Sequence, residues 1–285
     1  MTAIALSTLT IPEVIGRVHD LPSLPVVVME LLDTIGKDDV DIKTLAEKVS
    51  HDQALTAKTL RLANSSFYGM QRKITTISQA ISVLGFQSVR TLITAAAVTG
   101  SFETQRQSTF NLPAFWRHSL ATAVCAKSLA RHAHVNQEYA FMAGLLHDIG
   151  RLVLVSCFPE QYEAALEYRN QHDCYLFDAE REILAVEHAL VGSALAEHWK
   201  FPSVMQKAVA NHHTPDELET GSLATIVHVA DAITHALDLS ADADDLVPPL
   251  SDAAWSNLGL SAGVVMETLE ETQAQFAEAS QVLVA

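Results

Sequence analysis

The sequence predicts an all-α fold, in which a multi-helical N-terminal layer packs on a second helical bundle. Glycine (11 residues) and proline (9 residues) are sparse in this chain of 285 residues, and alanine, leucine and valine are abundant, which favours long helices with short connections over sheets. Apolar residues also recur at the three- and four-residue spacing of a helix face. The length allows one large domain or about two smaller ones.

The first part of the chain is expected to be a lead-in, residues 1–20, followed by a helical subdomain at residues 21–98. Asp41 and Asp52 are the expected N-caps of two helices, and Gly85 is the expected C-cap of another. The helices predicted in this subdomain span residues 26–35, 42–49, 53–63, 77–84 and 88–98.

A linker rich in small and polar residues, at 99–111, separates this layer from a second helical subdomain at 112–237. An acidic segment with two prolines follows at 238–252 and precedes a final amphipathic helix at 264–284. These two pieces form the C-terminal region, 238–285, whose helix is expected to dock on the body of the protein or on a partner.

The most informative feature is the pair His147 and Asp148, which lies inside a nearly unbroken apolar run. Such a run predicts a buried helix, where an ionised carboxylate beside an imidazole is costly unless a metal, a proton or hydrogen-bond partners satisfy it. The pair therefore directs attention to polar residues on the inward faces of other helices.

Four further segments place an imidazole or a carboxylate on an apolar stripe at helical spacing, namely those of His118, His188, His212 with its neighbour His213, and Asp231. A single histidine on such a stripe is usually a core residue bonded to a backbone carbonyl. Five helices that each direct histidine nitrogen or aspartate oxygen inward are instead typical of a metal site.

A competing set uses the same region, because His228, Asp231 and His235 also lie at helical spacing. These two histidines could satisfy the Asp231 carboxylate without any metal. Spacing alone does not exclude this alternative.

Charge is uneven along the chain, whose net charge is -16. The last basic residue is Lys207, and an acidic C-terminal third repels phosphate backbones, while a basic protein partner or simple solubility stays open. Residues 42–49 and 53–63 have the order of a helix-turn-helix motif, but the second helix offers only Lys58 and Arg61 for phosphate contact. Direct nucleic-acid binding is not expected. The acidic residues after Lys207 are Asp216, Glu217, Glu219, Asp231, Asp238, Asp242, Asp244, Asp245, Asp252, Glu267, Glu270, Glu271 and Glu278.

Three cysteines, Cys125, Cys157 and Cys174, show no Cys-x-x-Cys spacing and have apolar neighbours, so reduced thiols are expected rather than disulfides or zinc ligands. The N-terminus lacks a basic region before its short apolar stretch, and no stretch of about 18 continuous apolar residues occurs. We therefore expect a cytoplasmic protein that neither enters nor spans a membrane.

Several motifs carry a family resemblance. The stretches FWRHSL (115–120), AGLLHDIG (143–150), NHH (211–213) and VAD (229–231) resemble the HD superfamily of metal-dependent phosphohydrolases. The upstream stretches LPSLP (21–25), LRLANSSFYG (60–69) and AISVLG (80–85) are similar to the HDOD domain, the HD-related output domain of bacterial signalling proteins. The likeness runs from about Leu21 to about Leu237, and the joint occurrence of front and back motifs makes it specific.

The resemblance implies a ligand set for one or two divalent metal ions, with iron, manganese, zinc, magnesium and nickel all open and an empty site also allowed. It assigns His118, His147, Asp148 and Asp231 to a first ion, and it makes Asp148 a bridge to a second ion held by His188 and His212, with His213 as a further candidate. Metal-assisted phosphoester hydrolysis is the implied chemistry, and Arg151 and Arg117 are the candidates for contact with phosphate.

Three departures from the catalytic relatives that cleave cyclic dinucleotides argue against turnover. No Gly-Tyr-Pro follows His213, Arg151 replaces the usual lysine, and Ala114 supplies no carboxylate one turn before His118. HDOD domains are generally regulatory, so the resemblance predicts a non-catalytic bacterial signalling output domain that acts through a protein partner. The alternative is a metal-dependent phosphohydrolase acting on cyclic dinucleotides or nucleotides.

Overall fold

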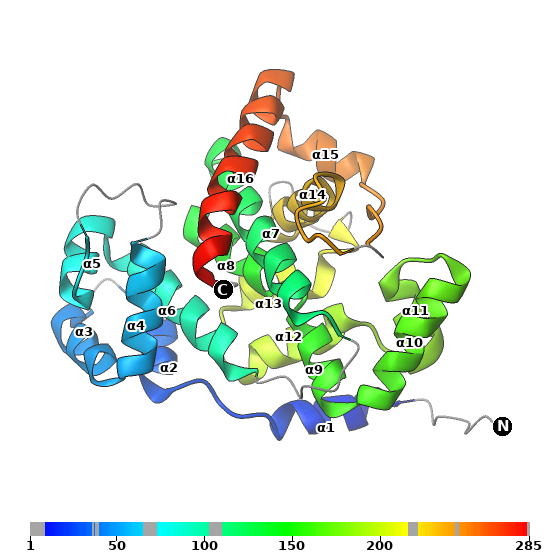
Figure 1. Cartoon of the computed structure of the whole chain (residues 1–285), viewed down its shortest axis with the longest axis horizontal. Coiled ribbons are helices and arrows are strands. Elements are labelled where there is room, and N and C mark those ends of the chain that lie inside the picture. Colours follow the sequence, from blue (N-terminus) through cyan, green and yellow to red (C-terminus); the bar gives the residue numbers. More distant parts are fainter. Residues whose placement is uncertain are drawn as a thin grey trace.

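The computed structural model describes residues 9–35, 37, 40–64, 73–102, 110–215, 222–242 and 245–283. Helices dominate these residues and no strand occurs among them, so the all-α prediction is confirmed. Figure 1 shows the helices between residues 26 and 101 as a layer at one side, with a larger bundle beside it, the first helix beneath the bundle and the last two helices above.

The N-terminal layer closely follows the predicted helices. Asp41 accepts a hydrogen bond from the backbone of Thr44, and Asp52 accepts one from the backbone of Leu55, so both predicted N-caps are confirmed. Gly85 ends a helix with φ of 83°, a conformation that a residue without a Cβ adopts easily. The helices are α1 (Ile11–His19), which lies within the predicted lead-in, α2 (Val26–Asp33), α3 (Ile42–His51), α4 (Gln53–Ala63), α5 (Ile77–Leu84) and α6 (Phe86–Ser101).

The bundle is built around its longest central helix, which contacts the helix before His147, the helix of Asp231 and the C-terminal helix (Figure 1). Its members are α7 (Leu112–His132), α8 (Gln137–Leu146), α9 (Ile149–Cys157), α10 (Pro159–His172), α11 (Leu176–Leu184), α12 (His188–His198), α13 (Ser203–Asn211) and α14 (Leu223–Ala236). Two helices follow it, α15 (Asp252–Leu258) and α16 (Ala262–Leu283).

The apolar run around His147 is not one regular helix. It breaks at His147 and Asp148, which join α8 to α9, with Asp148 at φ −96° and ψ 7°. The segment Gln137–Cys157 is long and apolar enough to cross a membrane by length and composition, but 78% of its apolar window is buried inside the protein. The expected mid-helix position of the pair is therefore corrected to a helix junction within the core.

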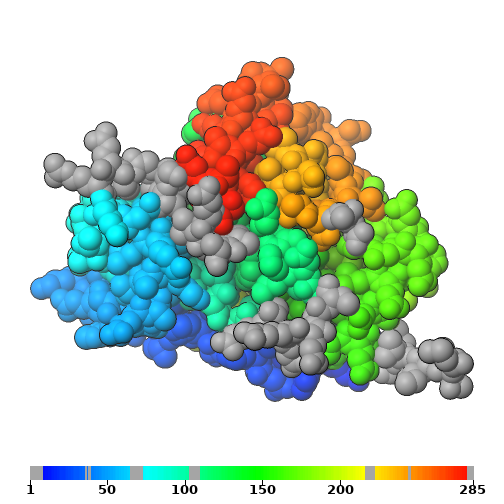
Figure 2. Space-filling view, in the orientation of Figure 1, coloured from blue at the N-terminus to red at the C-terminus, as the bar shows by residue number. Residues whose placement is uncertain are grey.

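One continuous apolar core joins the layer to the bundle, since its buried residues extend from Leu9 to Ala279. Trp199, at the end of α12, donates a hydrogen bond from Nε1 to the carbonyl oxygen of Pro22 at 3.2 Å and ties the two parts together. Figure 2 shows the layer packed directly against the bundle. Residues 103–109 of the predicted linker lie outside the described residues.

A backbone contact between α9 and α12 positions the candidate site. A Cβ atom added to Gly150 would lie 2.0 Å from the carbonyl oxygen of His188 and 2.6 Å from the nitrogen of Gly192. Only glycine permits this approach. The crossing brings Oδ1 of Asp148, two residues before Gly150, within 3.0 Å of the Nε2 atom of His188.

Candidate metal centre

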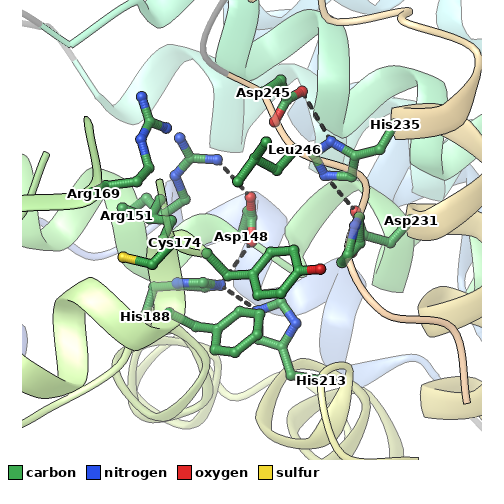
Figure 3. Close-up of a pocket in the computed structure, with 14 residues that line it drawn as sticks. Asp148, Arg151, Arg169, Cys174, His188, His213, Asp231, His235, Asp245 and Leu246 are labelled. Carbon is green, nitrogen blue, oxygen red and sulfur yellow. Dashed lines mark hydrogen bonds and ion pairs between the residues drawn. The ribbon is translucent and has the colours of Figure 1, made fainter. Parts of the chain in front are cut away.

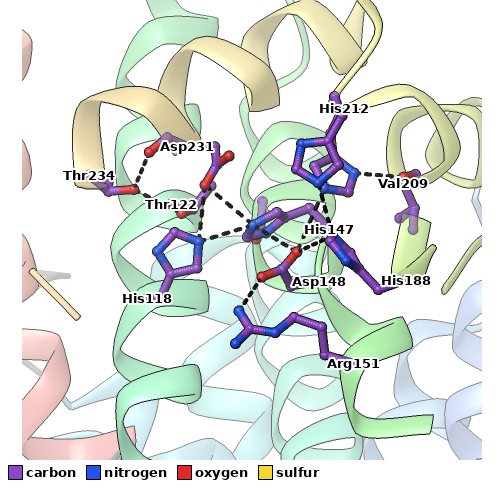
Figure 4. A network of polar contacts seen from close by, with 12 residues as sticks. His118, Thr122, His147, Asp148, Arg151, His188, Val209, His212, Asp231 and Thr234 are labelled. Atoms are coloured by element: carbon purple, nitrogen blue, oxygen red, sulfur yellow. Dashed lines mark hydrogen bonds and ion pairs between the residues drawn. The ribbon is translucent and has the colours of Figure 1, made fainter. Parts of the chain in front are cut away.

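Side chains from separate elements meet in one buried cluster (Figure 4). The α7 helix supplies His118, the α8–α9 junction supplies His147 and Asp148, and α14 supplies Asp231. The first residue of α12 is His188, and His212 follows the end of α13. Each of these six residues is at most 5% exposed.

One side of the cluster is centred on Asp231. Its Oδ1 atom lies 3.0 Å from Nε2 of His118 and 3.6 Å from Nε2 of His147. The two imidazole Nε2 atoms are 3.1 Å apart. Burial alone would raise the pKa of Asp231, but the neighbouring His235, His118 and His147 hold it well below its usual range.

The other side is centred on Asp148. Its Oδ1 atom lies 3.0 Å from Nε2 of His188 and 3.6 Å from the Nε2 atoms of both His147 and His212. The Nε2 atom of His213 reaches that of His188 at 2.9 Å. All seven predicted site residues therefore lie together, and His147 lies between the two aspartates.

Hydrogen bonds on the far edge of the rings orient the lone pairs toward this centre. The Nδ1 atoms of His147 and His212 lie 2.7 Å from the carbonyl oxygens of Gly144 and Val209. A carbonyl only accepts, so Nδ1 carries a proton, and in its neutral form each ring directs the Nε2 lone pair inward. Among the residues that the structure describes, the buried Nε2 atom of His212 has no hydrogen-bond partner. Inward lone pairs beside carboxylates are the donor set that a divalent metal binds, and the site fits such an ion.

A proton is the alternative occupant. Burial disfavours the charged form of His188, but the carboxylates of Glu180 and Asp148 outweigh it and raise the pKa of this histidine to about 10. Without a metal, the His188 ring is therefore positively charged and donates to both carboxylates. A metal would take the place of the proton on Nε2, because imidazole ligands bind in their neutral form.

Glu180 is a buried residue that sequence reasoning missed. Its Oε2 atom accepts hydrogen bonds from Nδ1 of His188 at 2.6 Å and from the backbone nitrogen of His188 at 2.8 Å, and the side chain is fully buried. A carboxylate behind a histidine ligand fixes its ring orientation. The available signal was the stripe Leu176, Glu180 and Leu184, which places the glutamate on the apolar face of α11.

Arg151 and Arg117 already have partners inside the protein. Arg151 donates from Nη1 to Oδ2 of Asp148 at 2.9 Å and from Nε to the hydroxyl of Tyr162 at 3.2 Å. Arg117 donates to the carbonyl oxygens of Ser240 and Leu239 at 3.3 and 3.1 Å. Arg151 still lines the cavity beside the cluster, whereas Arg117 is absent from the described lining.

The alternative set of His228, Asp231 and His235 is only partly assembled. His235 places Nε2 3.2 Å from Oδ1 of Asp231. His228 turns away: its Nδ1 lies 2.7 Å from the carbonyl oxygen of His212, and its Nε2 accepts from the backbone of Ser251 at 3.0 Å. Their spacing of three residues would allow His228 to contact Asp231, but these two hydrogen bonds direct the His228 ring toward His212 and Ser251 instead.

The cavity next to the cluster is small, about 60 Å³, and is shown in Figure 3. Asp148, His188 and Asp231 line its inner side. Asp245 and Leu246, from the acidic segment after α14, line it as well. Sites for small molecules commonly measure roughly 300–1,000 Å³, so this cavity has room for water or an ion but not for a nucleotide.

Residues 21–215 match the HDOD domain family. The chain belongs to the HDOD family. A candidate phosphohydrolase from Shewanella amazonensis is 30% identical, with a TM-score of 0.77 over 95% of this chain and 97% of its own. An HDOD domain protein of unknown function from Geobacter sulfurreducens has a TM-score of 0.80 and 23% identity, covering 96% of this chain and 99% of that one.

The HDOD chain is also similar to a cyclic di-GMP phosphodiesterase, CdgJ of Vibrio cholerae, with 26% identity over 144 residues. That match covers 50% of this chain and 32% of CdgJ. The chain spans less than two fifths of the length of the curated relatives it matches first. The family thus connects this chain to signal-transduction and phosphohydrolase proteins.

Proposed function

We propose that this protein is a regulatory HDOD module of a bacterial signalling pathway, working in the cytoplasm through contacts with a protein partner rather than by turnover of a substrate. The observation that carries the proposal is the closed cluster. Its six central residues are at most 5% exposed, and the cavity of about 60 Å³ lined by Asp148 and His188 is itself too small for a cyclic dinucleotide, while a larger hollow of about 350 Å³ shares Arg151 and Arg169 with it.

The engaged arginines support the same conclusion. A phosphodiesterase needs positive groups that stabilise phosphoryl charge in the transition state. Here Arg151 is paired with Asp148 and Tyr162, and Arg117 is bonded to backbone carbonyls. A phosphate would therefore have to compete with these bonds for both guanidinium groups.

The donor set nevertheless suits a divalent ion. We infer that His118, His147, Asp148 and Asp231 would hold one ion and that Asp148, His188 and His212, with His213 near them, would hold a second. A bound ion lowers the pKa of its water and neutralises phosphoryl charge. In the regulatory role, it would stabilise the fold by binding the native state alone.

A second candidate function, metal-dependent phosphohydrolase, is favoured by one observation: the complete ligand set converges. CdgJ is named as a phosphodiesterase, and the Shewanella amazonensis relative as a candidate phosphohydrolase. Under this reading the cavity would have to open before a substrate could enter.

Metal analysis and activity assays on purified protein supplied with manganese, iron or magnesium distinguish the two functions. We expect bound metal by elemental analysis, but no hydrolysis of cyclic di-GMP or of a generic phosphodiester above the rate of His147→Ala. Turnover that His147→Ala and Asp148→Ala both abolish would replace the regulatory proposal by the phosphohydrolase. Retention of a basic signalling protein, weakened when the exposed Glu270 and Glu278 are changed to glutamine, is expected if the acidic surface docks the partner.

A further inference from the structure

The segment that leads into α15 lies against the metal centre. We call residues 245–250 the strap. Asp245, Leu246 and Pro248 of the strap line the same cavity as Asp148 and His188, and Pro248 is buried. Figure 3 shows the Asp245 carboxylate directed at His235 and Leu246 near Asp148.

A histidine ties the beginning of the strap to the cluster. His235 places Nδ1 2.9 Å from Oδ2 of Asp245, while its Nε2 lies 3.2 Å from Oδ1 of Asp231. The hydroxyl of Ser240 donates to Oδ2 of Asp245 at 2.8 Å and holds this carboxylate in place. One imidazole therefore bridges a strap carboxylate and a carboxylate of the metal centre.

A second histidine of the same helix ties the other end. The backbone nitrogen of Ser251, directly after the strap, donates to Nε2 of His228 at 3.0 Å. The Nδ1 atom of His228 lies 2.7 Å from the carbonyl oxygen of His212. Because His228 and His235 are two turns apart on α14, they contact the strap at its two ends.

We propose that the strap, held in place by His228 and His235, is a gate that covers one side of the cavity next to the metal centre. His228 and His235 each contact both the strap and the cluster. An ordered cluster therefore favours a closed strap, and a closed strap favours an ordered cluster. This inference rests on the closed site of the proposed function and adds the element that regulates access to it.

A cysteine in the cavity reports strap opening without any metal or substrate. Cys174 lines the cavity together with Asp245 and Leu246, and Cys157, which is half-buried like Cys174 but absent from the described lining, serves as an internal control. Alkylation of both thiols by iodoacetamide is followed by mass spectrometry on the full, metal-free chain. The alkylation rate does not depend on turnover. A failure of the gate proposal can therefore be told apart from a failure of the proposed function.

Asp245→Ala is expected to raise the alkylation rate of Cys174 about tenfold, because a lost charge-assisted hydrogen bond enlarges the open population by about that factor. The rate at Cys157 should not change. The matched control, Glu270→Ala, removes one negative charge from an exposed position of α16 and should alter neither rate.

Ser240→Ala is the milder second variant, since it removes only the hydroxyl that holds Asp245. It should give a smaller increase at Cys174, and it carries the test if Asp245→Ala does not fold. An unchanged Cys174 rate in the folded variants would overturn the gate. Equal increases at Cys174 and Cys157 would overturn it too, because they would indicate general loosening.

Discussion

The N-terminal layer and the bundle are stabilised in different ways. The described part of the layer buries aliphatic side chains such as Val28, Val49 and Ile77, with a single buried charge at Arg90. The bundle buries the cluster of two aspartates and four histidines at one point of its core, with the buried Glu180 and His228 beside it. Apolar packing needs no partner from solution, whereas buried charges must be balanced by protons, arginine or metal. The stability of the bundle should therefore respond to changes that leave the layer unaffected.

The largest effect is expected at the α9–α12 crossing. Gly150→Ala places a methyl group 2.0 Å from the carbonyl oxygen of His188, so the helices must separate. We expect a loss of about 4 kcal/mol or more in the free energy of unfolding, measured by urea denaturation. Gly16→Ala, in α1 before the layer, meets no atom within 4 Å and should instead stabilise by about 0.5–1 kcal/mol. Similar changes in the free energy of unfolding for the two variants would contradict the predicted difference.

The next effect is on charge balance. Asp148→Asn removes the carboxylate that accepts from Arg151, and leaves a buried guanidinium without its counter-charge. The expected loss is about 3–5 kcal/mol in chelator-treated protein, the usual cost of breaking a buried pair from one side. Adding Arg151→Met to this variant should recover part of the lost free energy of unfolding, measured by urea denaturation. No recovery would mean that Asp148 acts through the histidines rather than through Arg151.

A smaller and more specific effect is expected behind the cluster. Glu180→Gln keeps the size of the side chain but weakens its hold on Nδ1 of His188, so divalent-metal affinity should fall about 10- to 100-fold. Titration calorimetry against a competing chelator measures this change. Glu182→Gln, exposed on the same helix, is the matched control and should bind like the wild type. Unchanged affinity in Glu180→Gln would show that the glutamate does not orient a ligand.

The smallest effect belongs to the layer. Asp52→Ala removes the cap on the backbone nitrogen of Leu55, which should cost about 1 kcal/mol in urea denaturation. Metal affinity should be unchanged, because α4 contributes nothing to the described cluster. A metal-dependent difference between this variant and the wild type would mean that the layer and the centre are coupled.

Local sequence signals predicted the layer well, because caps and spacing act within one helix. The helices at 53–63 and 77–84 begin and end as expected, as do the caps at Asp41 and Asp52. The inward direction of His118 and Asp231 also followed from spacing alone. These signals depend on neighbours three or four residues away and need no knowledge of the tertiary structure.

The pairings within the site could not be predicted in this way. His228 and His235 are both at helical spacing from Asp231, yet only His235 contacts it, and that choice depends on where α13 and the strap lie. Asp245 belongs to an aperiodic acidic segment that gave no signal of a buried role. The helix break at His147 was hidden because both flanking segments are apolar.

The glycine contact between α9 and α12 also bears on which ions the centre can accept. Two backbones in contact leave no side chain between them that could rotate to widen or narrow their separation. The two helices therefore hold the backbones of Asp148 and His188 at a fixed separation. An ion of different radius would have to be accommodated by rotation of the carboxylate and imidazole groups alone.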